Sequence, residues 1–260
     1  MSPTFALLVA FLAGLVVATV TAPVGVSGAV FLLPVQLDVL GVPSPAVTPT
    51  NLLFNVVATP GGLLRYRRSG ALSGELTCRI LAGTLPGVVL GTVARVFLAP
   101  GDRVFRLLAA AVLLPLGVWL CARRDRPPGP AAPVTSVTVV VLGLVVGIVG
   151  GVYGIGGGSL LGPILVGAGL SVACVAPAAL AATFLTSVTG VAAYGLLVLL
   201  DDGLARPDWA LGVLSGLGGL VGSYLGARLQ PLLPERGLRI VLGLLASGLA
   251  VTYAVQGLRA

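Results

Sequence analysis

A glycine-rich run at 154–159 is the part of the sequence best suited to hold a small ligand. It reads Gly-Ile-Gly-Gly-Gly-Ser and leads directly into an apolar stretch that contains Pro163. Glycine is costly inside a helix, so such a cluster indicates either close helix packing or a broken helix. A helix that starts at a break has unpaired N–H groups and a partial positive charge, which can hold an anion without a charged side chain.

A shorter version of this run lies near the N-terminus, where Gly25, Ser27 and Gly28 precede an apolar stretch that contains Pro34. The recurrence favours a binding role over helix packing alone. Two other glycine series, 83-87-91 and 218-222-226, have only a regular four-residue spacing. That spacing is common where membrane helices touch, so we predict that these two series serve packing.

Amide and hydroxyl side chains at helical spacing form the second candidate feature. Asn51 and Asn55 lie one turn apart in an apolar segment, and a buried amide surrounded by lipid needs hydrogen-bonding partners. For the serines and threonines, bonding to carbonyls of their own helix is the alternative role. We predict an anion site near the bilayer midplane, between the two glycine runs. Its predicted residues are Gly25, Ser27, Gly28, Thr50, Asn51, Asn55, Gly154, Gly156, Gly157, Gly158, Ser159, Thr183 and Ser187.

The missing residue types exclude several kinds of enzyme. The chain has no His, and all 15 basic residues are Arg, so His-based hydrolysis, His-ligated metals and lysine chemistry are excluded. The run at 25–28 is similar to the nucleophile motif of an intramembrane serine protease, but the usual His base is missing. The three cysteines lack CxxC spacing. We therefore expect no enzymatic activity, no cofactor and no metal site.

The composition predicts an all-α polytopic membrane protein. Apolar residues make up 57% of the 260 residues, charged residues only 9%, and the mean hydropathy is +1.11. At roughly 20 residues per spanning helix the chain allows about ten membrane segments and no soluble domain. The first four residues lack the positive charge of a cleaved signal peptide, so we expect the first segment to be retained. The predicted segments are 4–21, 26–40, 46–65, 74–99, 103–122, 134–151, 157–169, 174–199, 208–230 and 235–256.

The two halves of the chain align with each other. The matched pairs include Gly25 with Gly154, Gly28 with Gly157, Pro34 with Pro163, Thr50 with Thr183, Gly83 with Gly216 and Arg95 with Arg228. This alignment predicts a first membrane repeat at 1–122, a linker loop at 123–133 and a second repeat at 134–260. Duplicated membrane units are the usual construction of secondary transporters, with the functional site where the repeats meet.

Each repeat holds an odd number of segments, so the second repeat is inverted relative to the first if every segment crosses. The basic loop at 65–68 and its acidic counterpart at 201–208 agree with opposite faces, and the scattered arginines indicate orientation rather than nucleic-acid binding. The short segments 26–40 and 157–169 are those expected to enter the membrane without crossing it. We expect Arg95 and Arg228 to anchor at the membrane interface or to attract anions toward the entrances, rather than to bind at the centre.

The same residues resemble a known family. Two glycine-rich turns that lead to a proline are each followed by an Ala/Thr-rich segment, at 46–51 and 179–183, and by a Tyr-containing stretch that ends at Gly70 or Gly203. This pattern resembles the TauE/SafE sulfite-exporter family of membrane permeases over nearly the whole chain. The resemblance implies multi-pass insertion in the cytoplasmic membrane and transport of sulfite, sulfonates or similar sulfur-containing anions.

Two alternatives to an alternating-access transporter stay open at this point. A passive anion channel is the closer one, because Asp38 is the only acid that lies more than one residue inside a predicted segment and little is available to couple a proton. A membrane assembly subunit that transports nothing is the other, because a fold alone does not establish a function. The sequence does not name the anion or the direction of its movement.

Overall fold

The structure, a computed structural model, describes residues 2–72, 74–98, 102–122, 135–168, 170–200 and 206–259. These residues form ten α-helices, and no strand occurs among them. The predicted all-α fold class is therefore confirmed. The linker predicted at 123–133 and the acidic pair Asp201 and Asp202 lie outside the described residues.

The helix bounds follow the predicted segments closely, apart from the segment predicted at 26–40, where α2 covers only Ala29–Pro34 and a π-helical stretch follows at Val35–Val39. The first half contains α1 (Pro3–Thr21), α2 (Ala29–Pro34), α3 (Ser44–Arg68), α4 (Gly74–Leu98) and α5 (Asp102–Ala122). The second half contains α6 (Ser136–Tyr153), α7 (Gly157–Gly167), α8 (Val172–Leu200), α9 (Trp209–Leu229) and α10 (Glu235–Arg259). Both α2 and α7 are too short to cross a bilayer as straight helices.

Five helical stretches are long and apolar enough to cross a membrane, so the chain is a multi-pass membrane protein. They are Thr4–Val24, Gly74–Leu98, Ser136–Tyr153, Val172–Leu200 and Trp209–Leu232. Large apolar side chains face outward on them, for example Leu8 and Val16 on α1 and Leu196 and Leu199 on α8. Such an apolar surface requires surrounding lipid.

Two glycine seams hold the centre of the bundle together, as predicted. A Cβ atom on Gly83, Gly87 or Gly91 of α4 would overlap or crowd a backbone carbonyl of α6, at Val140, Leu144 and Ile148 in turn. Gly218, Gly222 and Gly226 of α9 meet the carbonyls of Phe11, Leu15 and Thr19 on α1 in the same way. Small residues let the backbones of membrane helices approach this closely. The contacts make Gly218, not the expected Gly216, the counterpart of Gly83.

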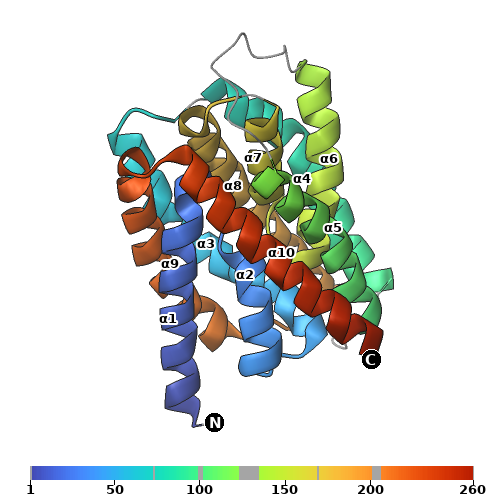
Figure 1. The fold of residues 1–260 in the computed structure, drawn as a ribbon. Helices are drawn as coiled ribbons and strands as arrows, with labels where there is room; N and C mark the ends of the chain where they lie inside the picture. The colour runs from blue at the N-terminus through green and yellow to red at the C-terminus, as the bar shows by residue number, and fades with distance from the viewer. Residues whose placement is uncertain are drawn as a thin grey trace.

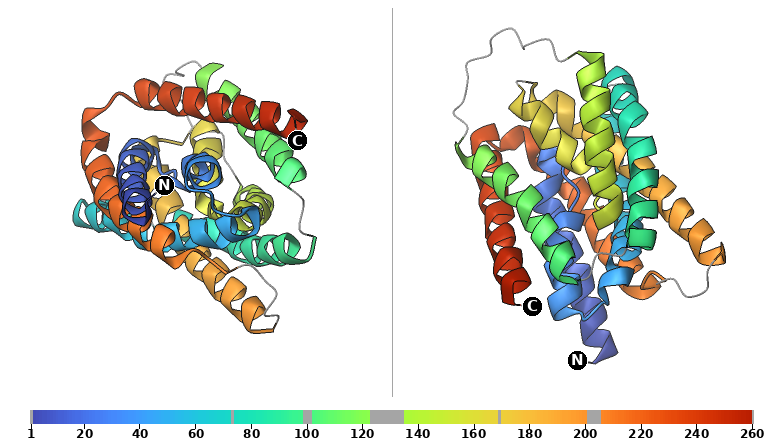
Figure 2. Two further views of the ribbon diagram at one scale, coloured as in Figure 1. Left: turned by 90° about the horizontal axis from the view of Figure 1, so that it is seen from below. Right: turned by 90° about the vertical axis from the view of Figure 1, so that its right-hand side faces the viewer.

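The helices α5 and α10 pack mainly against each other and form an outer layer beside the other helices (Figure 2). This pair reaches the rest of the bundle mainly through the short helices α2 and α7. A polar cluster strengthens one of these contacts. Arg106 of α5 and Gln256 of α10 both bond Asp38, at 3.2 Å and 3.3 Å, in the π-helical stretch Val35–Val39 that continues α2.

Both termini lie at one end of the bundle, whereas α6 begins at the opposite end (Figure 1). The helices α3 and α9 run side by side in the same direction, because Thr50 contacts Asp208 and Gly62 contacts Ser223. Arg206 therefore lies near the start of α3, and Ser69 lies at its far end.

Candidate anion site at the glycine turns

Two glycine turns with the same backbone conformation lie at the ends of α1 and α6. In the first turn, Gly25 has φ 74° and ψ 17°; in the second, Gly154 has φ 71° and ψ 19°. Gly156 also has a positive φ, 73°, immediately before α7 begins. This left-handed conformation strains residues with a Cβ atom, so glycine is the residue suited to these three positions.

Each leading glycine packs against the backbone of the other half of the chain. A Cβ atom on Gly25 would lie 2.5 Å from the Cα atom of Ala176 in α8. A Cβ atom on Gly154 would overlap the carbonyl oxygen of Thr48 in α3 and lie 3.0 Å from the Cβ atom of Asn51. Both turns are therefore held in place by the long helix of the opposite half.

Hydrogen bonds join the two turns directly. The backbone N–H of Ser27 donates to the Ser159 hydroxyl at 3.1 Å, and the Ser27 hydroxyl donates to the carbonyl of Ile155 at 3.2 Å. The Ser159 hydroxyl also donates to Ile155, at 2.9 Å, and lies 3.1 Å from the hydroxyl of Thr183. The structure thus brings together the predicted residues Ser27, Ser159 and Thr183.

The two predicted asparagines reach the turns from α3. Asn51 donates its amide N–H to the carbonyl of Ala29, the first residue of α2, at 3.3 Å. Asn55 donates to the carbonyl of Gly154 at 3.2 Å. Both side chains are fully buried, and the amide oxygen of each has no hydrogen-bonding partner.

Ser187 of α8 adds a third unpaired oxygen. Its buried hydroxyl has no partner and would lie 3.1 Å from a Cβ atom on Gly156. Leaving a polar atom buried and unpaired costs about 1–3 kcal/mol. A ligand that forms hydrogen bonds with these atoms would recover this cost, so they are the strongest pointer to a binding site at the second turn.

Thr186 contributes to this turn although it is not among the predicted site residues. Its hydroxyl accepts the backbone N–H of Gly157, the first residue of α7, at 3.1 Å. It also donates to its own helix, to the carbonyl of Ala182 at 2.7 Å. Thr186 lies three residues after Thr183, so both side chains lie on one face of a helix. This spacing could have identified Thr186 as a site residue from the sequence.

Some predicted site residues serve other contacts. The Thr50 hydroxyl donates to Ala46 at 2.6 Å and accepts the N–H of Asp208 at 2.9 Å, so it holds the start of α9. A Cβ atom on Gly158 would overlap the carbonyl of Ala179, and one on Gly28 would lie 2.8 Å from Val17. Both glycines allow close packing beside the turns.

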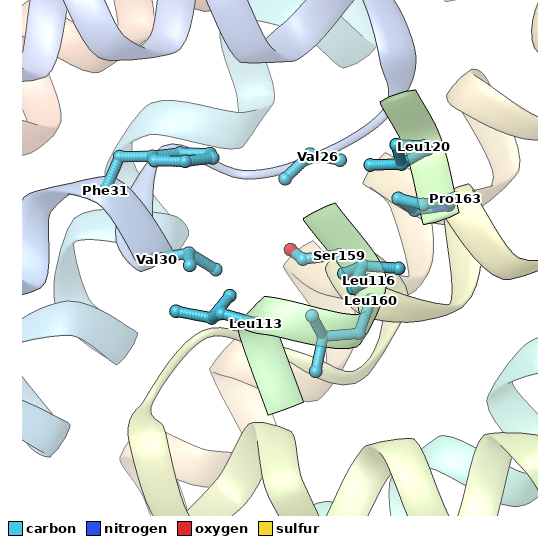
Figure 3. Close-up of a pocket in the computed structure, with 9 residues that line it drawn as sticks. All are labelled: Val26, Val30, Phe31, Leu113, Leu116, Leu120, Ser159, Leu160 and Pro163. Carbon is cyan, nitrogen blue, oxygen red and sulfur yellow. The ribbon is translucent and has the colours of Figure 1, made fainter. Parts of the chain in front are cut away.

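Two small cavities lie beside the glycine turns, and the described residues that line them do not include Asn51, Asn55 or Ser187. A cavity of about 20 Å³ lies between α2, α5 and α7, and among the described residues that line it only Ser159 has a polar side chain (Figure 3). A second cavity of about 10 Å³ lies beside Ser27 and Gly28. A space of this size holds about one water molecule. Neither cavity admits an oxyanion until the helices around it move apart.

Arg95 and Arg228, which the sequence alignment pairs, differ in burial. Arg228 is exposed, whereas only 5% of Arg95 is accessible, and Arg95 lies close enough to Tyr153 and Tyr194 to act on them electrostatically. The different pairing of the two seams explains the difference, because Arg95 follows Gly91 by one turn on the face of α4 that meets α6.

Two short helices that begin at glycine turns lie inside a multi-pass bundle, an arrangement typical of membrane transport proteins with broken helices at their centre. The family model for the sulfite exporter TauE/SafE matches residues 10–253. The chain therefore belongs to the TauE/SafE sulfite exporter family, whose members are transporters and not enzymes. No curated protein and no solved structure shows significant similarity to it.

Proposed function

We propose that this protein carries a small sulfur-containing oxyanion, such as sulfite or an organosulfonate, across the cytoplasmic membrane. The observation that carries this proposal is the second glycine turn, where the buried and unpaired hydroxyl of Ser187 lies beside Gly156, directly before the start of α7. A helix N-terminus offers backbone N–H groups and a partial positive charge to an anion. Membership of the TauE/SafE family supports the choice of a sulfur oxyanion.

Within this proposal the predicted site residues have two roles. The glycines shape the turns, because their missing side chains let the backbones meet. Ser27, Ser159 and Thr183 hold the turns together, while Asn51, Asn55 and Ser187 offer atoms to the ligand. Thr50 acts on α9 and supports the site only indirectly.

We further propose that residues 1–122 and 134–260 are inverted repeats that rock around this site, with 123–133 as their linker. The matched glycine seams and the matched backbone angles of Gly25 and Gly154 support the duplication. Inversion would give inward-open and outward-open states similar structures, as alternating access requires. The three arginines in the last turn of α3 support a cytoplasmic location for that end.

Cysteine labelling tests the orientation of the helices. Ser69→Cys and Arg206→Cys, each in a chain whose three native cysteines are replaced, are expected to react with a membrane-impermeant reagent from opposite faces. Ser69 follows α3 and Arg206 precedes α9, and these helices run in parallel. Labelling of both from the same face would contradict the proposed ten-segment orientation.

Transport in proteoliposomes tests the function itself. We expect sulfite flux that saturates with concentration and is accelerated by unlabelled sulfite on the far side of the membrane. Flux that rises linearly without such counterflow would favour the channel alternative. Absence of flux for sulfite, sulfonates and sulfate would favour an assembly subunit.

A further inference from the structure

The polar atoms at the second glycine turn include hydrogen-bond acceptors as well as the donors that an anion requires. The unpaired atoms of Asn51 and Asn55 are their amide oxygens, which can only accept a hydrogen bond or bind a cation. The Ser187 hydroxyl can accept as well as donate. A ligand that is only an acceptor, such as sulfate or a sulfonate, leaves both amide oxygens unpaired.

The orientation of both amides is fixed by what their nitrogens bind. Each nitrogen donates to a backbone carbonyl, of Ala29 for Asn51 and of Gly154 for Asn55. The reverse orientation would set an amide oxygen against a carbonyl oxygen, which is unfavourable. The two amide oxygens therefore remain acceptors while α3 holds its place beside the turns.

The start of α7 supplies the complementary groups. This helix has 11 residues, and the N–H groups of its first turn have no partner within the helix. Gly157 donates its N–H to the Thr186 hydroxyl at 3.1 Å. Donors from α7 and acceptors from α3 thus approach the same turn, at 154–157.

We propose that this site selects an oxyanion with one negative charge and one O–H group, of the hydrogen sulfite type, over the dianion. This inference rests on the proposed transport function. The O–H group would donate to an asparagine oxygen, and the charged oxygens would accept from the start of α7. A dianion would lack the donor, and its desolvation would cost roughly four times as much because that cost scales with the square of the charge.

A monovalent cation such as Na⁺ is the other ligand that amide oxygens could bind. The position of the oxygens beside the start of α7 disfavours it, because the partial charge of a helix N-terminus is positive. Among the residues the structure describes, no cluster of three or more His, Cys, Asp or Glu side chains could hold a metal ion. The proton-carrying anion therefore fits the site better.

The pH dependence of transport separates these ligands. Sulfite takes up its proton near neutral pH, whereas methanesulfonate stays a monoanion without an O–H group. The titratable or charged side chains near the site are Tyr153, Tyr194, Arg95 and Asp208, and the chain has no His. None of these types ordinarily titrates between about pH 6 and 8, so a change in flux over this range reports the ligand.

The experiment measures flux into proteoliposomes at equal pH on both sides, with total sulfite fixed. We expect sulfite flux to fall from about pH 6 to pH 8 in parallel with the hydrogen sulfite fraction. Methanesulfonate should be carried poorly at every pH, and replacing Na⁺ by choline should change nothing. Flux that is constant or rises with pH, efficient methanesulfonate transport, or a need for Na⁺ would each overturn the inference but leave transport intact. No flux of any sulfur anion would instead overturn the proposed function.

Ser187→Ala provides a second readout. It removes one ligand partner, so half-saturation for sulfite should rise about five-fold, while the small methanesulfonate flux changes less. Ser215→Ala is the matched control, because its hydroxyl bonds only carbonyls of its own helix, those of Leu211 and Gly212. Equal loss of both fluxes in Ser187→Ala would contradict a role in selecting the protonated anion.

Discussion

The two glycine turns have the same backbone but different surroundings. Carbonyls of the first turn are bonded from outside the site: Tyr66 donates to Ala22 at 3.1 Å and Gln230 donates to Pro23 at 2.7 Å. The second turn lies beside Asn55, which donates to Gly154, and beside Ser187, and each of these two side chains keeps an unpaired oxygen. In our proposal the first turn therefore supports the fold and the second turn faces the ligand.

The helices that follow the turns differ in the same sense. The second turn leads into α7, an uninterrupted helix of 11 residues. The first leads into α2, which has six residues and continues as a π-helical stretch. Only α7 is long enough to present a well-formed N-terminus to an anion. The second turn therefore carries the greater part of the proposed binding.

The largest effect is expected from adding a methyl group at either leading glycine. Gly25→Ala and Gly154→Ala combine left-handed strain with overlap onto a fixed backbone, so each should destabilise the protein by about 3 kcal/mol or more. The measurement is thermal unfolding of the purified protein in detergent.

Gly70→Ala is the control for these two variants. Its φ of 70° is similar, but no atom lies within 4 Å of the added Cβ position. It should therefore show only the backbone strain, about 1 kcal/mol. Equal destabilisation in all three variants would show that the contacts between the halves contribute nothing.

Asn55→Leu should have the next largest effect. It leaves the carbonyl of Gly154 without its donor and removes an acceptor from the site, so we expect a stability loss of about 1–3 kcal/mol and weaker sulfite binding. Unfolding and equilibrium binding measure the two consequences separately. Unchanged sulfite affinity would remove Asn55 from the site.

Tyr66→Phe tests the supporting turn with a smaller change. The variant loses the hydrogen bond to Ala22, which should lower stability by about 1 kcal/mol. Sulfite affinity should stay the same, because this contact lies outside the proposed ligand site. A large loss of affinity without a loss of stability would mean that the first turn binds ligand directly.

The glycine turns and the packing seams could be predicted from the sequence because glycine has few other uses in a membrane helix. The directions of neighbouring side chains could not. Thr50 and Asn51 are adjacent in α3, but a helix turns by about 100° per residue, so Thr50 faces α9 while Asn51 faces α2. Their partners depend on how α3 packs.

The burial of Arg95 is a second feature that the sequence could not predict. The alignment pairs it with Arg228, but the seams pair Gly83 with Gly218, so the offset between α4 and α9 differs from that in the adjoining segments. Glycine series with the same four-residue spacing can be aligned at more than one offset. Only the packing contacts show which offset occurs in the structure. That offset places Arg95 on the buried face of α4.

The most direct test of the central claim compares Ser187→Ala with the wild-type protein in equilibrium binding of sulfite, with unfolding measured alongside. The lost hydroxyl is buried without a partner in this structure, so its removal should not lower stability and should raise it by about 1–3 kcal/mol. Sulfite affinity should fall about five-fold, and Ser215→Ala should leave it unchanged. Unaltered affinity in a stable Ser187→Ala protein would contradict a sulfite site at the second glycine turn.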